Sequence, residues 1–440
     1  MNNFKFQFEW MDGGPPTKVA EHQATWCQLS IVVDNVVVTR HEDRRLQTVK
    51  QAVMIPLYPL AEWVAVNWWC LLNEGGNRRP ENLRRFSQRH NLRYAADGYS
   101  LPSLVMEAGD GHVVLEWKPI SSPFQHAAFL EQGGALMERE IWLLEIRRLV
   151  ESVLERCQSV GLKNTLLAEE WQAISRLGPD EERFCQAAGA LGIDPFGISE
   201  QDAELVAMVG DRLLPAESEL GLDFFSVAAL GQLEAQARWV VDHIATPSGF
   251  EAALNFTLTD LDTSLISSPW EAGYSAARRA RQLMRMTSPV EMLELGRLAK
   301  NGPDKFMESQ SAPALTPSQT QIPFEGLVSH RSEAEFIFSP KGKMRTDNWR
   351  FTFSRAVYDC LVRAGKGEPV TLLTKSHRDR QRANRAFAAE LLAPSAGIKQ
   401  LLGKTMPGEE DIAWLAEHFG VSDRVVRHQI ENHRIATIVT

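Results

Sequence analysis

RFTFSRAVYD at positions 350–359 and RANRAFAAELLAP at positions 382–394 decide the fold expected for the C-terminal part of this chain. In the second stretch, Phe387, Leu391 and Leu392 fall at i, i+4 and i+5, which places their side chains on one face of a helix. Pro394 closes that helix, because a proline removes a backbone donor and clashes with the preceding turn. The second stretch is therefore predicted to be a helix with a structural role.

Together the two stretches resemble the ImmA/IrrE metallopeptidase family, in which RFTxxHExxH is followed by an ANxFAAELLxP helix. The helix expected to begin at PWEAGY (269–274) is similar to the opening helix of the same family. The resemblance covers about residues 265–440 and implies a zincin-like, mostly helical domain with a short sheet. In HExxH, two histidines on one helical face hold Zn²⁺ and the glutamate activates the bound water.

The residues that carry this chemistry are replaced in the present chain. Arg355, Ala356 and Asp359 stand at the positions of the first histidine, the glutamate and the second histidine. A guanidinium offers no lone pair to a metal. At about 4 Å from a dication it is repelled by roughly 8 kcal/mol at an effective dielectric near 20. That repulsion offsets most of the ~10–16 kcal/mol apparent affinity of a structural zinc site, and Ala356 supplies no general base.

The third ligand of the family is an acidic residue just ahead of an Ala-Asn pair, and the matching stretch here is Arg380-Gln381-Arg382. Asp379 is the nearest acid, but an offset of one residue turns it by about 100° around a helix. The loss of three ligands and the base together predicts a pseudo-peptidase without metal or cofactor. Its candidate site is the former cleft, which contains Arg355, Ala356, Asp359, Arg380, Arg382 and Glu390. Glu390 is either a polar residue of this cleft or a simple surface residue.

The formal net charge of −9 hides a local excess of positive charge. Residues 341–385 carry twelve Lys/Arg against four Asp/Glu, a balance of +8, which leaves −17 for the rest of the chain. Such a segment is typical of a surface that faces nucleic acid or an acidic partner. The alternative is a solvated face whose charge is compensated by acidic neighbours.

The C-terminal sequence DIAWLAEHFGVS (411–422), followed by DRVVRHQI (423–430), indicates two helices joined by a short turn. A helix, a Phe-Gly-Val-Ser turn and a Ser-capped second helix are typical of a helix-turn-helix pair. In a version that reads DNA, Arg424, Arg427 and His428 would face a groove. In the peptidase family the corresponding helices are packing elements, so the pair is open to both interpretations.

The sequence predicts an α+β protein with three domains. Residues 1–122 look strand-rich, with a hairpin turn at Asp34-Asn35, a second hairpin near residues 108–111, and one Trp-rich helix at 60–71 whose tryptophans are expected in the core. Residues 123–264 are expected to be helical, including a long helix at 134–160 and a turn at Gly221-Leu222-Asp223. The zincin-like domain takes residues 265–440, and the Pro-rich segment 301–323 within it is a linker.

Composition places the chain among soluble globular proteins, with 44% apolar and 23% charged residues. No signal-peptide h-region is present, and no apolar run approaches the length of about 18 residues that a membrane span needs. The five cysteines are scattered and contain no CxxC pair, which favours buried free thiols over a disulfide or zinc framework. The expected location is the cytoplasm, with no membrane partner.

The leading functional hypothesis is a catalytically inactive, metallopeptidase-like protein with a regulatory or defence-associated role. The resemblance implies this role because active family members cleave regulatory partners, and it implies a protein partner encoded nearby. One alternative is an active zinc peptidase with a displaced metal site. The other is a nucleic-acid-binding regulator that uses the basic segment 341–385 and the C-terminal helices.

Overall fold

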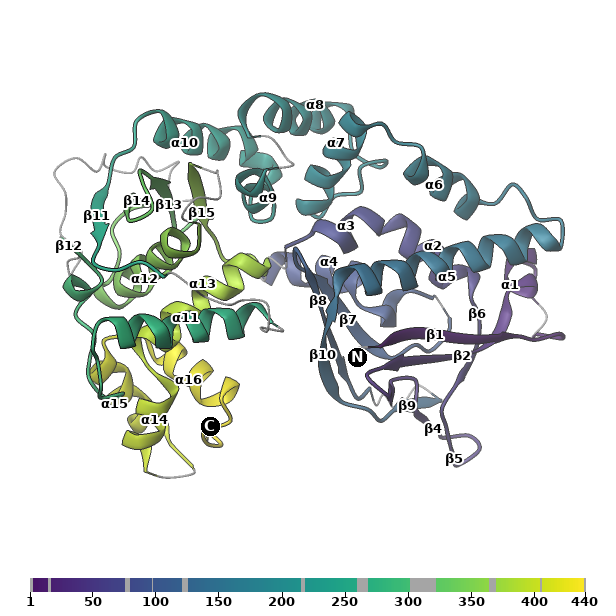
Figure 1. Cartoon of the computed structure of the whole chain (residues 1–440). Coiled ribbons are helices and arrows are strands. Elements are labelled where there is room, and N and C mark those ends of the chain that lie inside the picture. The colour runs from purple at the N-terminus through teal and green to yellow at the C-terminus, as the bar shows by residue number, and fades with distance from the viewer. Residues whose placement is uncertain are drawn as a thin grey trace. The chain divides into compact units, whose positions relative to one another are not determined.

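The computed structural model describes residues 3–14, 17–75, 80–96, 98–120, 126–214, 218–258, 268–300, 322–363, 369–403 and 406–438. These residues form a mixed α+β structure, as the sequence predicts, and the chain divides into two compact units, Met1–Arg212 and Leu213–Thr440 (Figure 1). The segment expected as a separate middle domain is shared between the two units. Nearly all of the expected linker 301–323 lies outside the described residues.

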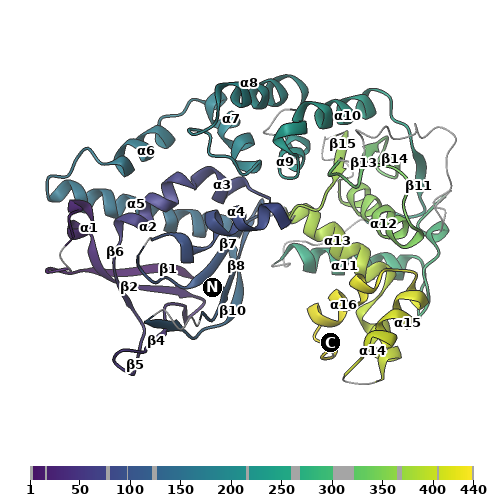
Figure 2. The ribbon, with the colours of Figure 1, turned by 180° about the vertical axis from the view of Figure 1, so that it is seen from behind.

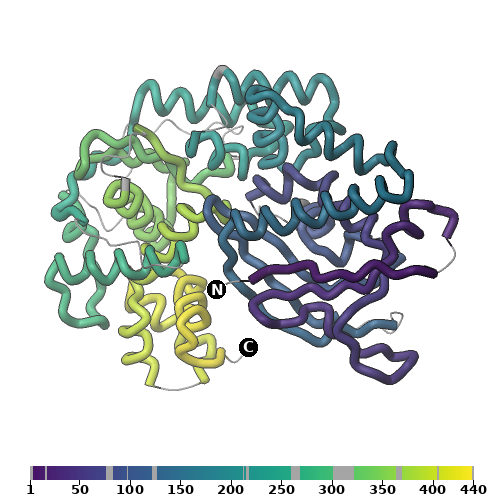
Figure 3. Tube along the Cα trace, turned by 45° about the vertical axis from the view of Figure 1, so that its right-hand side comes forward, coloured from purple at the N-terminus to yellow at the C-terminus, as the bar shows by residue number. Residues whose placement is uncertain are grey.

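A four-stranded antiparallel sheet opens the first unit. It contains β1 (Phe4–Trp10), β2 (Trp26–Val33), β3 (Val36–Val37) and β6 (Val53–Pro56), and β2 pairs with each of the other three. The tube drawing shows β1 and β2 as neighbouring purple segments (Figure 3). Asp34 and Asn35 adopt positive φ angles of 46° and 69°, as a two-residue hairpin turn requires. The predicted hairpin is therefore confirmed.

Two three-stranded antiparallel sheets complete the strands of this unit. One contains β7 (Ser103–Ala108), β8 (His112–Lys118) and β10 (Gly133–Glu138), and the other contains β4 (His41–Asp43), β5 (Thr48–Lys50) and β9 (Ala127–Phe129). The hairpin of β7 and β8 confirms the second predicted turn. The expected helix from 134 to 160 is wrong at its start, because residues 133–138 pair with β8 and the helix α5 begins at Arg139.

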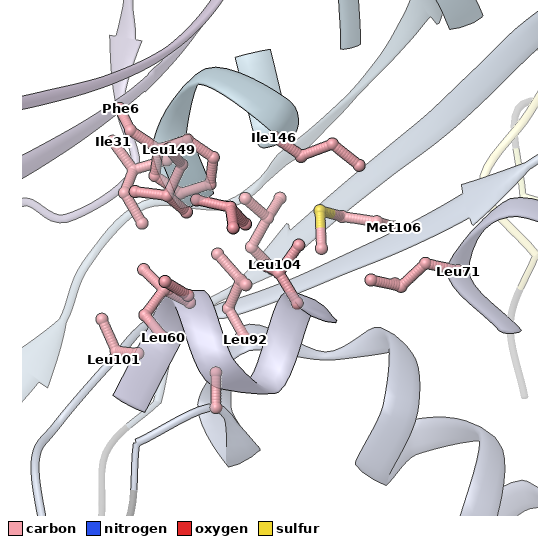
Figure 4. Close-up of a cluster of buried hydrophobic side chains, with 14 of the residues drawn as sticks. Phe6, Ile31, Leu60, Leu71, Leu92, Leu101, Leu104, Met106, Ile146 and Leu149 are labelled. Carbon is pink, nitrogen blue, oxygen red and sulfur yellow. The ribbon is translucent and has the colours of Figure 1, made fainter. Parts of the chain in front are cut away.

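The helices of the first unit surround an apolar core. They are α1 (Ala20–Ala24), α2 (Tyr58–Val66), α3 (Trp68–Asn73), α4 (Pro80–His90), α5 (Arg139–Ser159), α6 (Leu166–Ser175), α7 (Pro179–Ala190) and α8 (Glu200–Met208). The Trp-rich helix is interrupted at Asn67, and Trp68 and Trp69 are buried in the core as predicted. Figure 4 shows side chains from the strands meeting Leu60, Ile146 and Leu149 of α2 and α5.

A buried ionic group joins α3 to α4 in the first unit. Glu74 accepts hydrogen bonds from Arg89 Nε at 2.8 Å and from His90 Nε2 at 3.0 Å. Burial alone would raise the pKa of the Glu74 carboxyl, but the His90 and Arg89 hydrogen bonds outweigh it and hold this pKa below its usual value. The carboxylate therefore contributes stability above a pH of about 4.5, the unfolded value, and this contribution is lost as the pH falls through the folded-state pKa.

Replacing Glu74 by glutamine is expected to lower the unfolding free energy of the first unit by about 2 kcal/mol at neutral pH, because charge-assisted hydrogen bonds are lost. The variant should lose less unfolding free energy than wild type as the pH falls below 4.5, because it lacks the carboxylate that becomes protonated there. Urea unfolding of wild type and variant at neutral and acidic pH measures both effects, with the exposed Glu116→Gln as a matched control. An acid dependence identical to that of wild type would contradict the assignment to Glu74.

The second unit is built around one antiparallel sheet of five strands. Its order is β12 (Ala299–Lys300), β11 (Phe250–Leu254), β14 (Glu335–Pro340), β13 (Gly326–His330) and β15 (Val370–Leu373). The strand predicted at residues 335–338 is confirmed as β14. The short sheet expected for the C-terminal domain is thus present, although its strand β11 comes from residues ahead of position 265.

The helices of the second unit pack on this sheet and on one another. They are α9 (Glu219–Phe225), α10 (Leu233–Ala245), α11 (Pro269–Leu283), α12 (Thr346–Arg363), α13 (Asp379–Leu392), α14 (Ser395–Leu402), α15 (Glu409–Phe419) and α16 (Asp423–Asn432). The turn expected at Gly221-Leu222-Asp223 is wrong, because these residues lie inside α9. Figure 2 shows α11 beside α13. Gly273 permits this close packing, since a Cβ there would collide with the carbonyl oxygen of Ala383.

All five cysteines are buried and free. Burial raises the pKa of each thiol, to about 12 for Cys27, Cys185 and Cys360 and to about 11 for Cys157. These groups are therefore protonated at neutral pH and pack as small apolar residues, as the sequence predicts. Within the described ranges, no helix is both long and apolar enough to cross a bilayer.

Candidate functional site

The structure brings together the three positions at which the family resemblance would place zinc ligands. Arg355 and Asp359 lie one turn apart on α12, and Arg380 lies in the first turn of α13. Arg380 Nη1 donates to Asp359 Oδ2. Asn384 links Arg355 to Asp359, because its Oδ1 accepts from Arg355 Nε at 2.8 Å and its Nδ2 donates to Asp359 Oδ1 at 3.3 Å. The two stretches that resemble the peptidase motifs therefore face each other across one polar cluster.

Arg355 is fully buried within this cluster, and its guanidinium makes several hydrogen bonds. Nη1 donates to the carboxylate of Glu325, which precedes β13. Nη2 donates to the Thr374 carbonyl at 2.7 Å and to Gln381 Oε1 at 2.8 Å. A buried guanidinium with this set of acceptors is held in one geometry. The expectation that Arg355 lines an accessible basic cleft is wrong, because its side chain has no solvent exposure.

Asp359 is also buried and is surrounded by donors. Thr371 Oγ1 of β15 donates to Asp359 Oδ2 at 3.1 Å, beside the contact with Arg380. Burial raises the pKa of the Asp359 carboxyl to about 7, while the Asn384 hydrogen bond, the Arg355 charge and the Thr371 hydrogen bond act in the opposite direction. The adjoining guanidinium of Arg380 further favours the carboxylate form. Ala356 is fully buried in the apolar core of the unit and offers no polar group.

A further carboxylate reaches the cluster from α9. Asp223 is buried, and Arg380 Nη2 donates to its Oδ2. Arg378 Nε lies 3.4 Å from Asp223 Oδ1. Arg380 therefore lies between Asp223 and Asp359 and contacts both carboxylates. Sequence analysis placed Asp223 in a turn and did not identify it as a site residue, since a single aspartate beside two phenylalanines carries no motif.

The charges of the described cluster are balanced. Three buried or nearly buried arginines (Arg355, Arg378 and Arg380) meet three carboxylates (Glu325, Asp359 and Asp223). Arg350, a further basic residue of the 341–385 segment, is buried and donates to the Gly420 carbonyl at 3.0 Å and the Leu293 carbonyl at 2.7 Å. These contacts favour the interpretation that the basic segment is compensated by acidic and carbonyl oxygens within the protein.

Glu390 belongs to a different polar cluster of the same unit. It accepts from Arg278 Nε at 3.1 Å, from the Ser395 backbone at 3.0 Å and from Gln429 Nε2 at 2.9 Å. His433 Nε2 lies 3.6 Å from the same carboxylate. Glu390 thus ties α13 to α11, α14 and α16. It is buried, so the expectation of a simple surface residue is wrong. Arg382 lies half-buried on α13.

The C-terminal helices α15 and α16 form the predicted helix-turn-helix pair, with Gly420 in the left-handed conformation that ends α15. Ser422 occupies the N-cap position, but its side chain makes no capping hydrogen bond. Of the three candidate nucleic-acid contacts, Arg424 and His428 are exposed, whereas Arg427 is paired with Glu409. Although the His428 side chain is exposed, neighbouring atoms remove part of the water around its ring. This desolvation and the Arg424 charge lower the pKa of His428, so the ring is neutral at pH 7.

The charge of this helix pair opposes binding to a polyanion. Residues 409–433 carry six acidic residues and two arginines, a formal balance of −4. Phosphate binding draws its affinity from the neutralisation of phosphates by Lys and Arg. Of the two arginines, Arg427 is paired with Glu409, and Arg424 is without an ion-pair partner among the described residues.

The site residues do not fit a metal. Two of the three ligand positions hold arginines, and the remaining aspartate is already bound by Arg380, Thr371 and Asn384. Within the part of the chain that the structure describes, no group of three or more His, Cys, Asp or Glu side chains could hold a metal ion.

Comparison with known proteins yields no relative for this chain. No protein-family model, no curated protein sequence and no solved structure matches it.

Proposed function

We propose that this chain is a catalytically inactive, metallopeptidase-like protein that acts by binding another protein, in a regulatory or defence-associated role. The observation that carries the proposal is the convergence of Arg355, Asp359 and Arg380 in one cluster. These residues occupy the ligand positions of the resembling motifs, and they lie far apart in the sequence. Ion pairs thus stand where the family would hold its metal.

The composition of the cluster supports the loss of catalysis. A zinc hydrolase needs an open metal position and a general base that activates the bound water. Here Arg355 fills the interior with a guanidinium, and Ala356 stands at the position of the base. We therefore propose that the ion-pair cluster replaces the metal as the element that joins α12 to α13, with no cofactor.

Protein binding, in the cytoplasm, is the role that remains for such a scaffold. The family resemblance points to regulatory proteins as partners, and the products of neighbouring genes are the first candidates. Nucleic-acid binding finds less support, because the C-terminal helices carry a net negative charge and the arginines of the 341–385 segment named above are internally paired. No observation on the described residues favours a displaced zinc site.

Restoring the family residues is expected to create a zinc site if the three positions are the former ligand positions. The variant combines Arg355→His, Ala356→Glu, Asp359→His and Arg380→Glu. Asp223→Asn is added because Arg380→Glu would otherwise place two carboxylates side by side. We expect one zinc per chain after dialysis, measured by elemental analysis, and an increase in melting temperature on adding zinc, because binding to the folded state stabilises it.

Two controls make this experiment decisive. A variant that carries Arg355→His and Arg380→Glu but keeps Asp359 should bind zinc more weakly, since it offers one histidine fewer than the restored site. Wild-type protein should contain no stoichiometric zinc. A restored variant that folds, by circular dichroism, and takes up no zinc would contradict the family resemblance. Stoichiometric zinc in wild type that is lost on Asp359→Ala would instead contradict the proposed inactivity.

A further inference from the structure

The outer face of α15 carries an exposed tryptophan. Trp414 has 51% of its surface exposed, whereas the opposite face of the same helix is buried in the core of the unit through Ile412, Leu415, Ala416 and Phe419. Figures 1 and 2 show α15 next to α14 and α16. A large aromatic ring kept at the surface of a helix whose other face is fully packed has the character of a binding hot spot.

The ring of Trp414 is held in place by its neighbours. It stacks on His418, one turn later, with ring centroids 5.7 Å apart and an interplanar angle of 27°. His418 is fixed in turn, because its Nε2 donates to the Val290 carbonyl at 2.7 Å and its ring meets Phe419 edge-on at 4.8 Å. A ring that is already ordered loses little conformational entropy when a partner binds.

Two glutamates flank the ring on the same helical face. Glu410 stands at i−4 and Glu417 at i+3 from Trp414, and these spacings place all three side chains close together on a helix surface. Both glutamates are exposed, and neither has an ion-pair partner among the described residues. Glu409, by contrast, is paired with Arg427 of α16. The free negative charge of α15 is therefore concentrated around the exposed ring.

We call Glu410, Trp414, Glu417 and His418 the Trp414 surface.

We propose that the Trp414 surface docks a basic segment of a partner protein, in which a lysine or arginine lies on the Trp414 ring between Glu410 and Glu417. This inference rests on the proposed protein-binding function and names the chemistry of its partner. A cation over an indole face is attracted by the ring quadrupole, and the flanking carboxylates add complementary charge that orients the incoming segment. The same negative charge repels phosphate groups, so a nucleic acid does not fit this surface.

The test uses the full-length protein and a short fluorescein-labelled peptide rich in arginine and lysine, followed by fluorescence anisotropy. Wild type should bind the peptide, and binding should weaken as salt is added. Trp414→Ala should lower the affinity by roughly ten-fold, the effect expected for a partly desolvated cation–π contact, and Trp414→Phe should restore part of it. Glu410→Gln/Glu417→Gln should chiefly slow association.

A matched control separates this surface from the overall negative charge of the protein. Glu200 and Glu204 are exposed at i and i+4 on α8, with no tryptophan between them, so Glu200→Gln/Glu204→Gln removes the same charge and should leave affinity unchanged. Equal losses in the two double variants, or a Trp414→Ala variant that binds like wild type, would overturn the proposal. So would self-association on a sizing column that Trp414→Ala abolishes without peptide binding. None of these outcomes affects the zinc-restoration test, so failure of this proposal can be told apart from failure of the proposed function.

Discussion

Arg355→Ala is expected to lower the unfolding free energy of the second unit by about 3–5 kcal/mol, the range seen when one member of a buried ionic group is removed. The guanidinium is fully buried and donates to Glu325, Gln381 and the Thr374 carbonyl. Its removal takes the nearest cation from the Glu325 carboxylate and one donor each from Gln381 Oε1 and the Thr374 carbonyl. The loss would exceed that of an ordinary large-to-small change at the surface by several-fold.

Chemical denaturation monitored by tryptophan fluorescence and circular dichroism measures this effect. Arg345→Ala is the matched control, because Arg345 lies in the same basic segment with 82% of its side chain exposed, and we expect a change within about 0.5 kcal/mol. If both variants lose the same small amount, Arg355 is not the buried centre of an ionic cluster. A second variant, Arg355→Met, keeps the volume and tests the charge alone.

Asp223→Ala is expected to cost about 3 kcal/mol, because it leaves Arg380 and Arg378 without a carboxylate that both contact. Arg380→Ala, made alone and combined with Asp223→Ala, completes a double-mutant cycle. We expect a coupling energy of about 1.5 kcal/mol or more between Asp223 and Arg380, as for residues that share one buried ion-pair network.

The surface pair Glu234 and Arg238 on α10 provides the comparison for this cycle. It is an exposed i, i+4 pair, and such pairs couple by about 0.3–0.5 kcal/mol. A coupling energy between Asp223 and Arg380 no larger than that of the surface pair would show that their ion pair does not stabilise the contact between α9 and the cluster. The larger value would show that residues ahead of position 265 are part of the folded unit that holds Arg355, Asp359 and Arg380.

Local patterns in the sequence predicted much of the secondary structure. The Asp34-Asn35 turn, the strand at 335–338, the helix from Pro269 and the C-terminal helix-turn-helix pair rest on turn chemistry, alternation or helical spacing within a few residues. The burial of Trp68 followed from the apolar face at helical spacing, whereas Trp63 of the same face is only partly buried. These features depend on neighbours in the chain, so their signals are present in the sequence.

The two wrong predictions of secondary structure share a physical cause, because contacts with residues distant in the sequence decide the structure of both segments. Residues 133–138 were expected to be helical, but β8 provides a ladder for them, and Gly133 and Gly134 weaken the helical alternative. The glycine at 221 suggested a turn, yet it is buried inside α9, where tertiary packing outweighs its low helix propensity. The local sequence alone therefore does not determine the strand at 133–138 or the helix at 219–225.

What the sequence by itself determined is the chemistry that is missing. Arg355 and Ala356 cannot bind zinc or act as a base wherever they lie, because those abilities belong to the side chains. What only the tertiary structure decided is the set of contacts around Arg355, Asp359 and Arg380. The sequence suggested an open basic cleft, but Asp223 lies 157 residues from Arg380 and still neutralises it. The buried arginines are paired with carboxylates because an uncompensated buried charge strongly lowers the free energy of unfolding.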